Sequence, residues 1–469
     1  MTDFRRRAAL AVLLTAEAMN MLDGTIVHVA APVIHARLGG RAADVPWFTA
    51  AYTLPFALLL ITGGRLGDIA GRARVFRIGV AGFTLASAAC AMAGSPGALI
   101  AARAVQGACA ALVIPQTIGL IRARFEGPAL ARAMGAIGPV MGLSAVCGPV
   151  LGGLLTEALS WRGAFLVNVP LGVAVLAASG VLREDRAARR PRPDLPGTAL
   201  VTVGTGLVVF PLVQTGGGSW QWGGAVVGAA VLAALVPYVR WSARRGRSPL
   251  VEPSLFANRG FPAALVASVL FFAVMTGLSL VIAMSLQSGR AGADARTAGL
   301  AMLPWSAGMA VASWAAGTWL VPRIGARLMF VGLAVLGAGI LGMVAVEATS
   351  PGSRWMLEPA LGIAGCGLGL FTVPFFTTAL HRVRPHETGS AAGLLNAVQQ
   401  VGGTLGVALL GGTFLAAAPA HGPAAATERA AGAALALLPA TAFAASFMTR
   451  KTRAPRPSAA RTAAAQAHD

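Results

Sequence analysis

Charged side chains are scarce in this sequence, and acidic ones are the scarcest. Only 12% of the 469 residues are charged, and 17 Asp and Glu residues stand against 37 Lys and Arg residues. The hydrophobic content of 56% and the mean hydropathy of +0.71 lie outside the range of soluble globular proteins. This composition excludes an ordinary soluble protein and indicates a chain that crosses a membrane several times.

Cysteine is also rare, and its placement excludes two common roles. The four cysteines all lie in apolar runs without C-x-x-C spacing: Cys90, Cys109, Cys147 and Cys366. Such residues are typical small apolar fillers, so the sequence predicts neither a metal site nor a disulfide framework. A cleavable signal peptide is not expected, because the first apolar run is too long and no small-residue cleavage site follows it.

Long apolar runs recur over the whole chain, each long enough to cross a bilayer as a helix. The sequence predicts fourteen such spans, at 8–31, 46–66, 75–94, 97–121, 133–156, 162–182, 197–214, 222–240, 262–287, 298–321, 327–346, 356–380, 390–416 and 430–449. The expected fold class is therefore an all-α membrane protein.

The net charge of +20 is distributed unevenly along the chain. Loops on one side of the predicted membrane hold 29 of the 37 Lys and Arg residues, loops on the other side hold seven, and Arg103 lies inside a span. The positive-inside rule then places both termini in the cytoplasm of a multi-pass protein of the cell membrane. Contact of basic loops with anionic lipids explains this charge without nucleic acid as a partner.

Two charged, proline-containing stretches divide the chain. They predict an N-terminal six-helix bundle at 1–182, cytoplasmic linkers with two additional transmembrane helices at 183–261, and a C-terminal six-helix bundle at 262–450. A basic cytoplasmic tail at 451–469 is expected to be disordered. Paired six-helix bundles with an added central pair are what a duplicated transporter would show.

One side of the first span is polar at membrane depth. On a helix, Glu17, Asn20 and Asp23 fall within an arc of about 120°. Because a charge in the membrane is costly unless it faces protein or water, we expect this face to point into a cavity. Desolvation disfavours the ionised form of a carboxyl group, so Asp23, and Glu17 with it, could bind and release protons. A permanently paired structural acid is the alternative, and His28 could be a pore-lining base or a packed neutral imidazole.

The fourth span supplies a possible counter-charge. Arg103 is the only Lys or Arg residue predicted well inside a span, and Gln106 lies one turn further on the same face. A guanidinium stays protonated, so Arg103 cannot carry the proton itself, but it can pair with a nearby acid in one conformation and release it in another. A permanent Arg–carboxylate pair is the alternative.

The loop between spans two and three reads GRLGDIAGRAR. Gly64 and Gly71 permit a tight turn, while Asp68 can favour a helix N-terminus or pair with Arg72 or Arg74. Such a charged latch can hold one conformation closed, and a solvated loop is the alternative.

The fifth span is rich in glycine and contains a proline. Gly148 and Gly152 would allow close helix packing, and Pro149 bends a helix by removing a backbone hydrogen bond. Packing alone could explain the glycines, but a kinked, glycine-rich helix also suits a helix that moves during transport.

These segments together resemble the major facilitator superfamily, and specifically its drug:proton antiporters with fourteen transmembrane helices. GRLGDIAGRAR is similar to the loop motif of the superfamily, apart from Ile69, where a basic residue is usual. RAVQG at 103–107 resembles the fourth-span motif whose arginine is linked to proton coupling. Span five resembles the antiporter motif through Gly135, Gly148, Pro149 and Gly152, with Ser144 in place of one glycine.

Three further segments carry the resemblance. LDGTIVHVAAP resembles the first-span signature of the fourteen-span branch, with His28 in place of asparagine. WRGAFLVNVPLG at 161–172 and GLLNAVQQVGGTLGVALLG at 393–411 match other segments typical of that branch. In the latter, Gln399 replaces a frequent arginine, so the role of that arginine does not transfer.

The resemblance implies two six-helix bundles plus two extra central helices, and a proton-coupled exporter of amphipathic small molecules, drugs or antibiotics by alternating access. It implies no cofactor and a protein that functions as a monomer with protons and membrane lipids as partners. A proton-coupled importer of a small nutrient would use the same fold. A membrane-embedded enzyme is the remote alternative, because the six histidines are scattered.

The substrate cavity is expected between the bundles and to be largely apolar. Its candidate residues are Asn20, Gln106, Phe271, Trp305, Phe375, Asn396 and Gln400, with Phe272, Phe371 and Phe376 as further aromatic candidates. Any of these aromatic side chains could instead face lipid.

Overall fold

The computed structural model describes residues 3–182, 184, 194–213, 220–245, 253–256, 260–288, 294–350, 353–381, 383–384 and 388–449. Every regular element in these ranges is a helix, and none is a strand. The all-α expectation is therefore confirmed for the described part of the chain. The predicted basic tail at 451–469 and most of the linker after residue 182 lie outside the described residues.

The helices before the linker form the N-terminal helix group. They are α1 Asp3–Leu38, α2 Val45–Ala70, α3 Arg72–Met92, α4 Pro96–Arg122, α5 Gly127–Gly135, α6 Ile137–Leu159, α7 Gly163–Leu166 and α8 Asn168–Ala178. Local signals set several of these ends. Ser95 caps α4 by accepting a hydrogen bond from the backbone N–H of Ala98 at 3.3 Å. Gly71, at φ +104°, makes the sharp turn between α2 and α3.

The helices from residue 260 onward form the C-terminal helix group. They are α11 Gly260–Ser288, α12 Ala295–Ala301, α13 Leu303–Ala315, α14 Val321–Ile324, α15 Leu328–Thr349, α16 Arg354–His381, α17 Thr388–Gly406 and α18 Gly412–Thr449, with π-helical turns at Ala316–Leu320 and Val407–Gly411. Between the two groups lie α9 Leu195–Val213 and α10 Trp220–Arg244. Short 3-10 helices occur at Ala42–Asp44, Ser179–Val181, Pro253–Phe256 and Gly325–Arg327.

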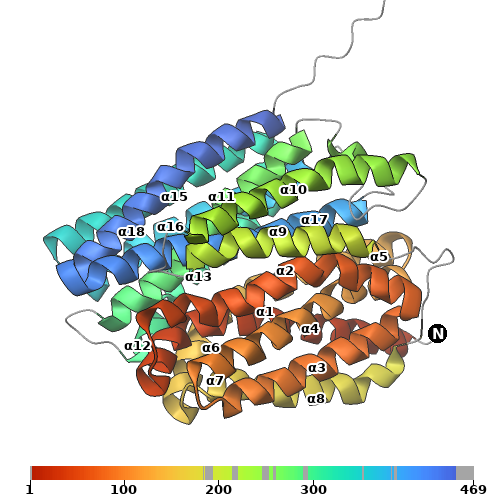
Figure 1. Ribbon diagram of the computed structural model, residues 1–469, viewed down its shortest axis with the longest axis horizontal. Helices are drawn as coiled ribbons and strands as arrows, with labels where there is room; N and C mark the ends of the chain where they lie inside the picture. Colours follow the sequence, from red (N-terminus) through yellow and green to blue (C-terminus); the bar gives the residue numbers. More distant parts are fainter. Residues whose placement is uncertain are drawn as a thin grey trace, which may run out of the picture.

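The two helix groups lie side by side (Figure 1). In the N-terminal group α1 packs on α6 and α4 packs on α2 and α3, while in the C-terminal group α16 packs on α13 and α15 and α11 packs on α17 and α18. The pair α9 and α10 packs mainly on itself, and α9 also touches α2 and α17. The central pair is therefore an addition at the edge of the junction between the groups.

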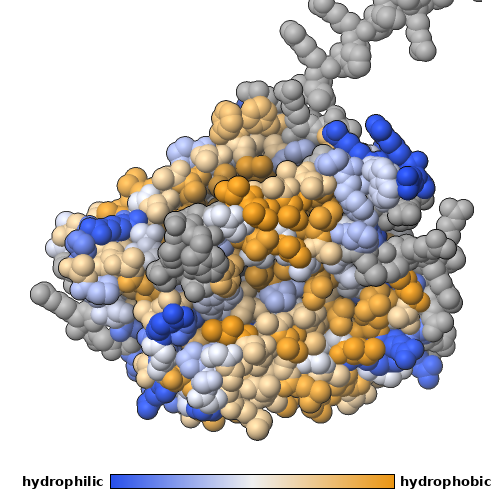
Figure 2. Space-filling model, in the orientation of Figure 1, coloured by the Kyte–Doolittle hydropathy of each residue, from blue (hydrophilic) through white to orange (hydrophobic). Residues whose placement is uncertain are grey.

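Apolar side chains cover the middle of the molecule, and polar ones gather at its two ends in the view of Figure 2. Within the described residues, ten helical stretches are long and apolar enough to cross a membrane, and the shorter apolar helices Cys147–Leu159 and Pro196–Val208 accompany them. This pattern is that of a multi-pass membrane protein.

The two helix groups are joined near one end of the molecule, which we call the Leu38 end because α1 finishes there. On α1, Nδ1 of His28 lies 3.2 Å from the Ser279 hydroxyl of α11. The carbonyl of the next residue, Val29, accepts a hydrogen bond from Nε2 of Gln287 at 2.9 Å. These polar contacts lie beside apolar packing of α1 against α11, so the groups are held together in this half.

Two further contacts join the groups in the same half. The hydroxyls of Thr53 on α2 and Thr404 on α17 are 2.6 Å apart. On α6, Gly153 lies against the backbone of Ala295 at the start of α12, where any larger residue would collide. Glycine is therefore needed at this crossing because the two backbones approach so closely.

Candidate functional site

Four buried polar side chains from three helices meet inside the N-terminal helix group. Asp23 lies on α1, Arg103 and Gln106 lie on α4, and Asn168 is the first residue of α8. All four have an exposed fraction of 0%. An acid and a base buried this completely in a membrane protein must satisfy each other or a ligand.

Asp23 is the centre of this cluster. Its Oδ2 accepts a hydrogen bond from a terminal nitrogen of Arg103 at 2.5 Å, which is also an ion pair. Its Oδ1 accepts from Nε2 of Gln106 at 2.8 Å and from Nδ2 of Asn168 at 2.7 Å. The carboxylate therefore receives three donors, one of which is charged, and these short bonds hold α1 to both α4 and α8.

Arg103 is fixed by more than its carboxylate partner. Its Nε donates to the backbone carbonyl of Phe48 at 3.0 Å, and the same terminal nitrogen that reaches Asp23 donates to Oε1 of Gln106 at 2.7 Å. The guanidinium lies 4.4 Å from the centre of the Tyr52 ring, within the range of a cation–π interaction. Among the described residues its other terminal nitrogen, Nη2, has no hydrogen-bond partner. The network thus extends from α4 to α2.

Through Gln106 the network also reaches α3. Its Nε2 donates to the Ser87 hydroxyl at 2.7 Å as well as to Asp23, and the Cys90 thiol lies 3.7 Å from its Oε1. Because Arg103 and Gln106 are three residues apart, both project from one face of α4. The predicted pairing of Arg103 with Asp23, and the predicted place of Gln106 beside it, describe the contacts that are present.

Asn168 is the member of the four-residue cluster that sequence reasoning missed. The segment WRGAFLVNVPLG contributed to the family resemblance, but no residue in it was expected to touch Asp23. A signal was present, because Asn168 is the only polar side chain between Gly163 and Ala178. An isolated amide in an apolar span needs a buried partner, although the sequence cannot show which one.

The other polar residues predicted on the first span lie outside these contacts. Glu17 is buried, and its Oε2 has no partner within the described residues. Asn20 is buried and donates to the carbonyl of Ala16 in its own helix, at 2.9 Å. His28 is buried at the contact with Ser279 described above, and its Nε2 has no partner in the described chain.

The loop motif forms a local ion pair. Arg72 donates from Nε at 3.1 Å and from a terminal nitrogen at 2.8 Å to the same oxygen of Asp68, and Arg74 is exposed. Of the two predicted partners, Asp68 therefore takes Arg72. Gly71 lies against Glu184, whose carboxylate accepts from the backbone N–H of Ala73 at 3.1 Å in the first turn of α3. Gly64 packs beside Pro115 of α4.

The residues of the fifth-span motif contact two different helices. Gly148 lies against Thr25 and Gly152 against Ile26, both on α1. The carbonyl of Pro149 lies against Gly299 of α12, in the C-terminal helix group. The motif therefore places α6 in close contact with α1 on one side and with α12 on the other, next to the Gly153 crossing.

The aromatic candidates for a substrate cavity are packed together. Phe271, Phe371 and Phe375 are fully buried, and the rings of Phe271 and Phe371 stack with centres 4.0 Å apart. Phe371 and Phe375 stack in the same way at 5.5 Å. In this conformation these three rings contact one another rather than an open cavity. Trp305 is buried on α13.

The polar candidates of the C-terminal group lie on another helix. Asn396 and Gln400 are half-buried on α17, the helix that meets α2. The structure thus brings Asp23, Arg103 and Gln106 together. It places the C-terminal candidates on other helices, without a contact to that cluster among the described hydrogen bonds. The described residues also include no group of three or more His, Cys, Asp or Glu side chains placed to hold a metal ion.

Two packed groups of membrane-spanning helices around a buried ion pair are an architecture that secondary transporters use. A family model described as Major Facilitator Superfamily matches residues 13–407. The chain therefore belongs to the Major Facilitator Superfamily, as the sequence motifs predicted, and this family makes it a membrane transporter rather than an enzyme.

Relatives with known names cover most of the chain. It is 43% identical over 420 residues to the probable actinorhodin transporter of Streptomyces coelicolor, covering 87% of this chain and 72% of the relative. It is 36% identical over 414 residues to the puromycin resistance protein of Streptomyces alboniger, covering 87% and 82%. It is 33% identical over 401 residues to a multidrug resistance protein of Mycobacterium tuberculosis, covering 85% and 74%.

Solved structures support the fold. An auto-inhibited peptide transporter of the POT family gives a TM-score of 0.71 at 16% identity, covering 96% of this chain and 99% of that one. A bacterial homolog of the human lysosomal transporter Spinster, in an inward-facing conformation, gives 0.65 at 16% identity, covering 96% and 97%. At these identities the similarity concerns the fold alone.

Proposed function

We propose that this protein exports amphipathic small molecules, antibiotics among them, in exchange for protons. The names of its relatives support export: one is named for actinorhodin transport, one for puromycin resistance and one for multidrug resistance. The observation that carries proton coupling is the Asp23–Arg103 pair, completely buried at membrane depth and tied to three neighbouring helices.

The exchange of a proton at Asp23 would change this network directly. A proton on Asp23 removes the charge that balances Arg103 and occupies a lone pair that now accepts a donor. Arg103 would then depend on its remaining acceptors, the carbonyl of Phe48 and Oε1 of Gln106. Because a buried unpaired guanidinium is costly, protonation favours a different arrangement of α1, α2 and α4.

The network lies close to the contacts that join the two helix groups. Phe48 and Tyr52, which contact Arg103, are on the same stretch of α2 as Thr53, which meets Thr404. On α1, His28 is less than two turns beyond Asp23 and meets Ser279. A change at the Asp23 pair is therefore transmitted over a short distance to the interface that must open for alternating access.

The lengths and breaks of the helices support the fourteen-span topology that we propose. Two of the ten candidate stretches are 55 and 59 residues long, and each is too long for a single crossing. Breaks at Gly325, with φ +63°, and Gly422, with φ +80°, divide them. With the two shorter apolar helices, this supports fourteen spans, arranged as bundles at 1–182 and 262–450 with two central helices between them.

The orientation rests on charge. The basic loops predict that both termini lie in the cytoplasm and that the Leu38 end faces outward in the plasma membrane. The contacts at that end then close the external side, so substrate would enter from the cytoplasm or inner leaflet. Opening of the external side would let a proton reach Asp23. At 100 mV, each proton moved inward supplies roughly 2.3 kcal/mol, enough to expel a substrate against a tens-fold gradient.

Transport in proteoliposomes tests the direction and the ion. In right-side-out vesicles, whose lumen corresponds to the cytoplasm, we expect an imposed inward proton gradient to drive preloaded ethidium or puromycin out of the lumen. Protons should move inward at the same time, which an internal pH-sensitive dye measures. Asp23→Asn should abolish both, whereas Asp44→Asn, which removes a carboxylate from a loop at the Leu38 end, should abolish neither.

Two outcomes would contradict the proposal. Substrate and protons that move in the same direction would make the protein a symporter, which is the importer alternative. Gradient-driven efflux that is unchanged in Asp23→Asn would remove Asp23 from coupling. Replacement of the proton gradient by a sodium gradient distinguishes the coupling ion.

A further inference from the structure

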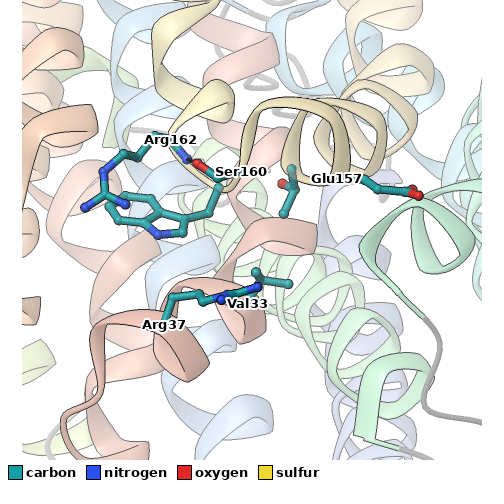
Figure 3. A pocket seen from close by; sticks show the side chains of 7 residues that line it. Val33, Arg37, Glu157, Ser160 and Arg162 are labelled. Carbon is teal, nitrogen blue, oxygen red and sulfur yellow. Dashed lines mark hydrogen bonds between the residues drawn. The ribbon is translucent and has the colours of Figure 1, made fainter.

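A polar pocket at the Leu38 end takes no part in the mechanism described so far. It has a volume of about 410 Å³ and is formed by the last turns of α1 and α6 and the segment that leads into α7 (Figure 3). Its walls combine two arginines, Arg37 and Arg162, with two hydroxyl residues, Thr156 and Ser160, over the apolar surface of Trp161. All of these residues belong to the N-terminal helix group.

The two arginines give the pocket its charge. Among the described residues neither Arg37 nor Arg162 forms an ion pair. Arg162 stacks over the Trp161 ring at 4.4 Å, and one of its terminal nitrogens contacts the Ala93 carbonyl at 3.4 Å. Glu157 also lines the pocket, but its carboxylate points away from both guanidinium groups in Figure 3. Donors of both arginines therefore remain available to an anion.

Membrane topology does not account for these two arginines. The positive-inside rule explains the basic residues of the opposite end, whereas the loops that the sequence assigns to this side hold only seven of the 37 Lys and Arg residues. Two of those seven line one pocket. Such a concentration on the sparsely charged side indicates a local requirement for positive charge.

A buried hydroxyl supplies a second, independent sign of a ligand. Thr156 lines the pocket with an exposed fraction of 5%, and its Oγ1 has no hydrogen-bond partner among the described residues. A buried hydroxyl without a partner is costly, and a hydrogen bond to an oxygen atom of a bound ligand would recover that cost. Next to it, Ser160 is the only non-glycine residue with positive φ, +67°, in the described chain.

We propose that this pocket binds a phosphate group, carried by an anionic phospholipid or by a free phosphate ion. Guanidinium groups match phosphate oxygens in pairs of parallel hydrogen bonds, and the hydroxyls of Thr156 and Ser160 can donate to the remaining oxygens. The pocket lies at the ends of two membrane-spanning helices, at the depth of lipid headgroups, and Trp161 and Val33 provide apolar surface for the first carbons of the acyl chains. The site is independent of the transport direction and of Asp23.

Lipid binding to the purified full-length protein tests this site. Binding of phosphatidylglycerol is measured by native mass spectrometry and by the shift in thermal unfolding on addition of the lipid to protein in phosphatidylcholine nanodiscs. Arg37→Gln and Arg162→Gln should each weaken binding about tenfold or more, since a hydrogen bond to a charged group contributes about 1.5–3 kcal/mol. Arg41→Gln is the matched control, because Arg41 is exposed at the same end, pairs with Asp44 and lies outside the pocket.

Thr156→Val separates binding from folding. Without a ligand, removal of an unpartnered buried hydroxyl should leave the protein as stable as the wild type or more stable. With phosphatidylglycerol, the same variant should bind several-fold more weakly. A variant that is stable and yet binds less lipid would support the site in a way that misfolding cannot imitate.

A second arm replaces the lipid with inorganic phosphate in detergent solution. Stabilisation by phosphate that is lost in Arg37→Gln supports a site for free phosphate. Stabilisation by the lipid alone supports a headgroup site. If Arg37→Gln and Arg162→Gln bind phosphatidylglycerol and phosphate as Arg41→Gln does, or if neither compound binds the wild type, the proposal is wrong.

Discussion

Removal of the Asp23 charge should destabilise the protein as well as uncouple it, and the two effects can be separated. In Asp23→Asn the side chain keeps its shape, but Arg103 remains fully buried and loses the one carboxylate partner that it has among the described residues. Breaking a buried pair by removing one partner typically costs about 3–5 kcal/mol, because an uncompensated charge is left behind. That is a large share of the ordinary stability of about 5–15 kcal/mol.

The geometry of the network leaves no easy compensation. The new amide would place an NH₂ group where the carboxylate now accepts donors. Turned one way it faces Arg103, and turned the other way it faces the donors of Gln106 and Asn168. Rotation of the Gln106 amide would in turn break its contacts to Ser87 and Arg103. We therefore expect most of the cost to persist in Asp23→Asn.

A double variant isolates the contribution of charge. Asp23→Asn combined with Arg103→Met removes both charges, and buried ion pairs replaced by uncharged side chains often lose little stability. We expect the double variant to regain more than half of the stability lost in Asp23→Asn, although proton-coupled transport stays absent. Chemical denaturation of the purified protein in detergent gives the free energies, and the proteoliposome assay gives transport.

Two results would refute this reasoning. An Asp23→Asn protein as stable as the wild type would show that Arg103 is not left uncompensated. A double variant no more stable than Asp23→Asn would show that the loss arises from packing or hydrogen bonds rather than from charge. Restored transport in the double variant would remove both residues from proton coupling.

Two further predictions concern other contacts. Asn168→Ala removes one of the three donors to Asp23, so it should lower the free energy of unfolding by about 1–3 kcal/mol in the same denaturation assay, which is less than the loss in Asp23→Asn. A loss equal to or larger than that of Asp23→Asn would contradict the assigned contact. In a background without native cysteines, Thr53→Cys with Thr404→Cys should form a disulfide between α2 and α17 that stops transport until it is reduced, because these hydroxyls are 2.6 Å apart across the interface. The matched control is Thr62→Cys with Thr198→Cys, at a hydroxyl pair 3.0 Å apart that joins α2 to α9. If transport survives the cross-link between positions 53 and 404 but not the control cross-link, the helix groups do not separate at Thr53.

Much of the site could be predicted from the sequence because membrane burial makes charge conspicuous. Asp23 and Arg103 are rare ionisable residues in apolar runs, and their cost in a bilayer forces them toward a partner. Helical periodicity placed Gln106 on the same face as Arg103, and the two side chains are hydrogen-bonded to each other in the structure. The choice of Arg72 over Arg74 as the partner of Asp68 needed coordinates, since both arginines lie within reach in sequence.

By itself the sequence determined that the chain is helical, crosses the membrane many times and belongs to a superfamily of transporters, because hydrophobic length, charge asymmetry and glycine motifs are local properties. Only the tertiary structure decided that Asn168 completes the coordination of Asp23, that Phe271 stacks on Phe371, and that Arg37 and Arg162 share one pocket. These contacts join residues far apart in the chain, and the register between two packed helices depends on the whole set of side chains between them, which no local pattern encodes.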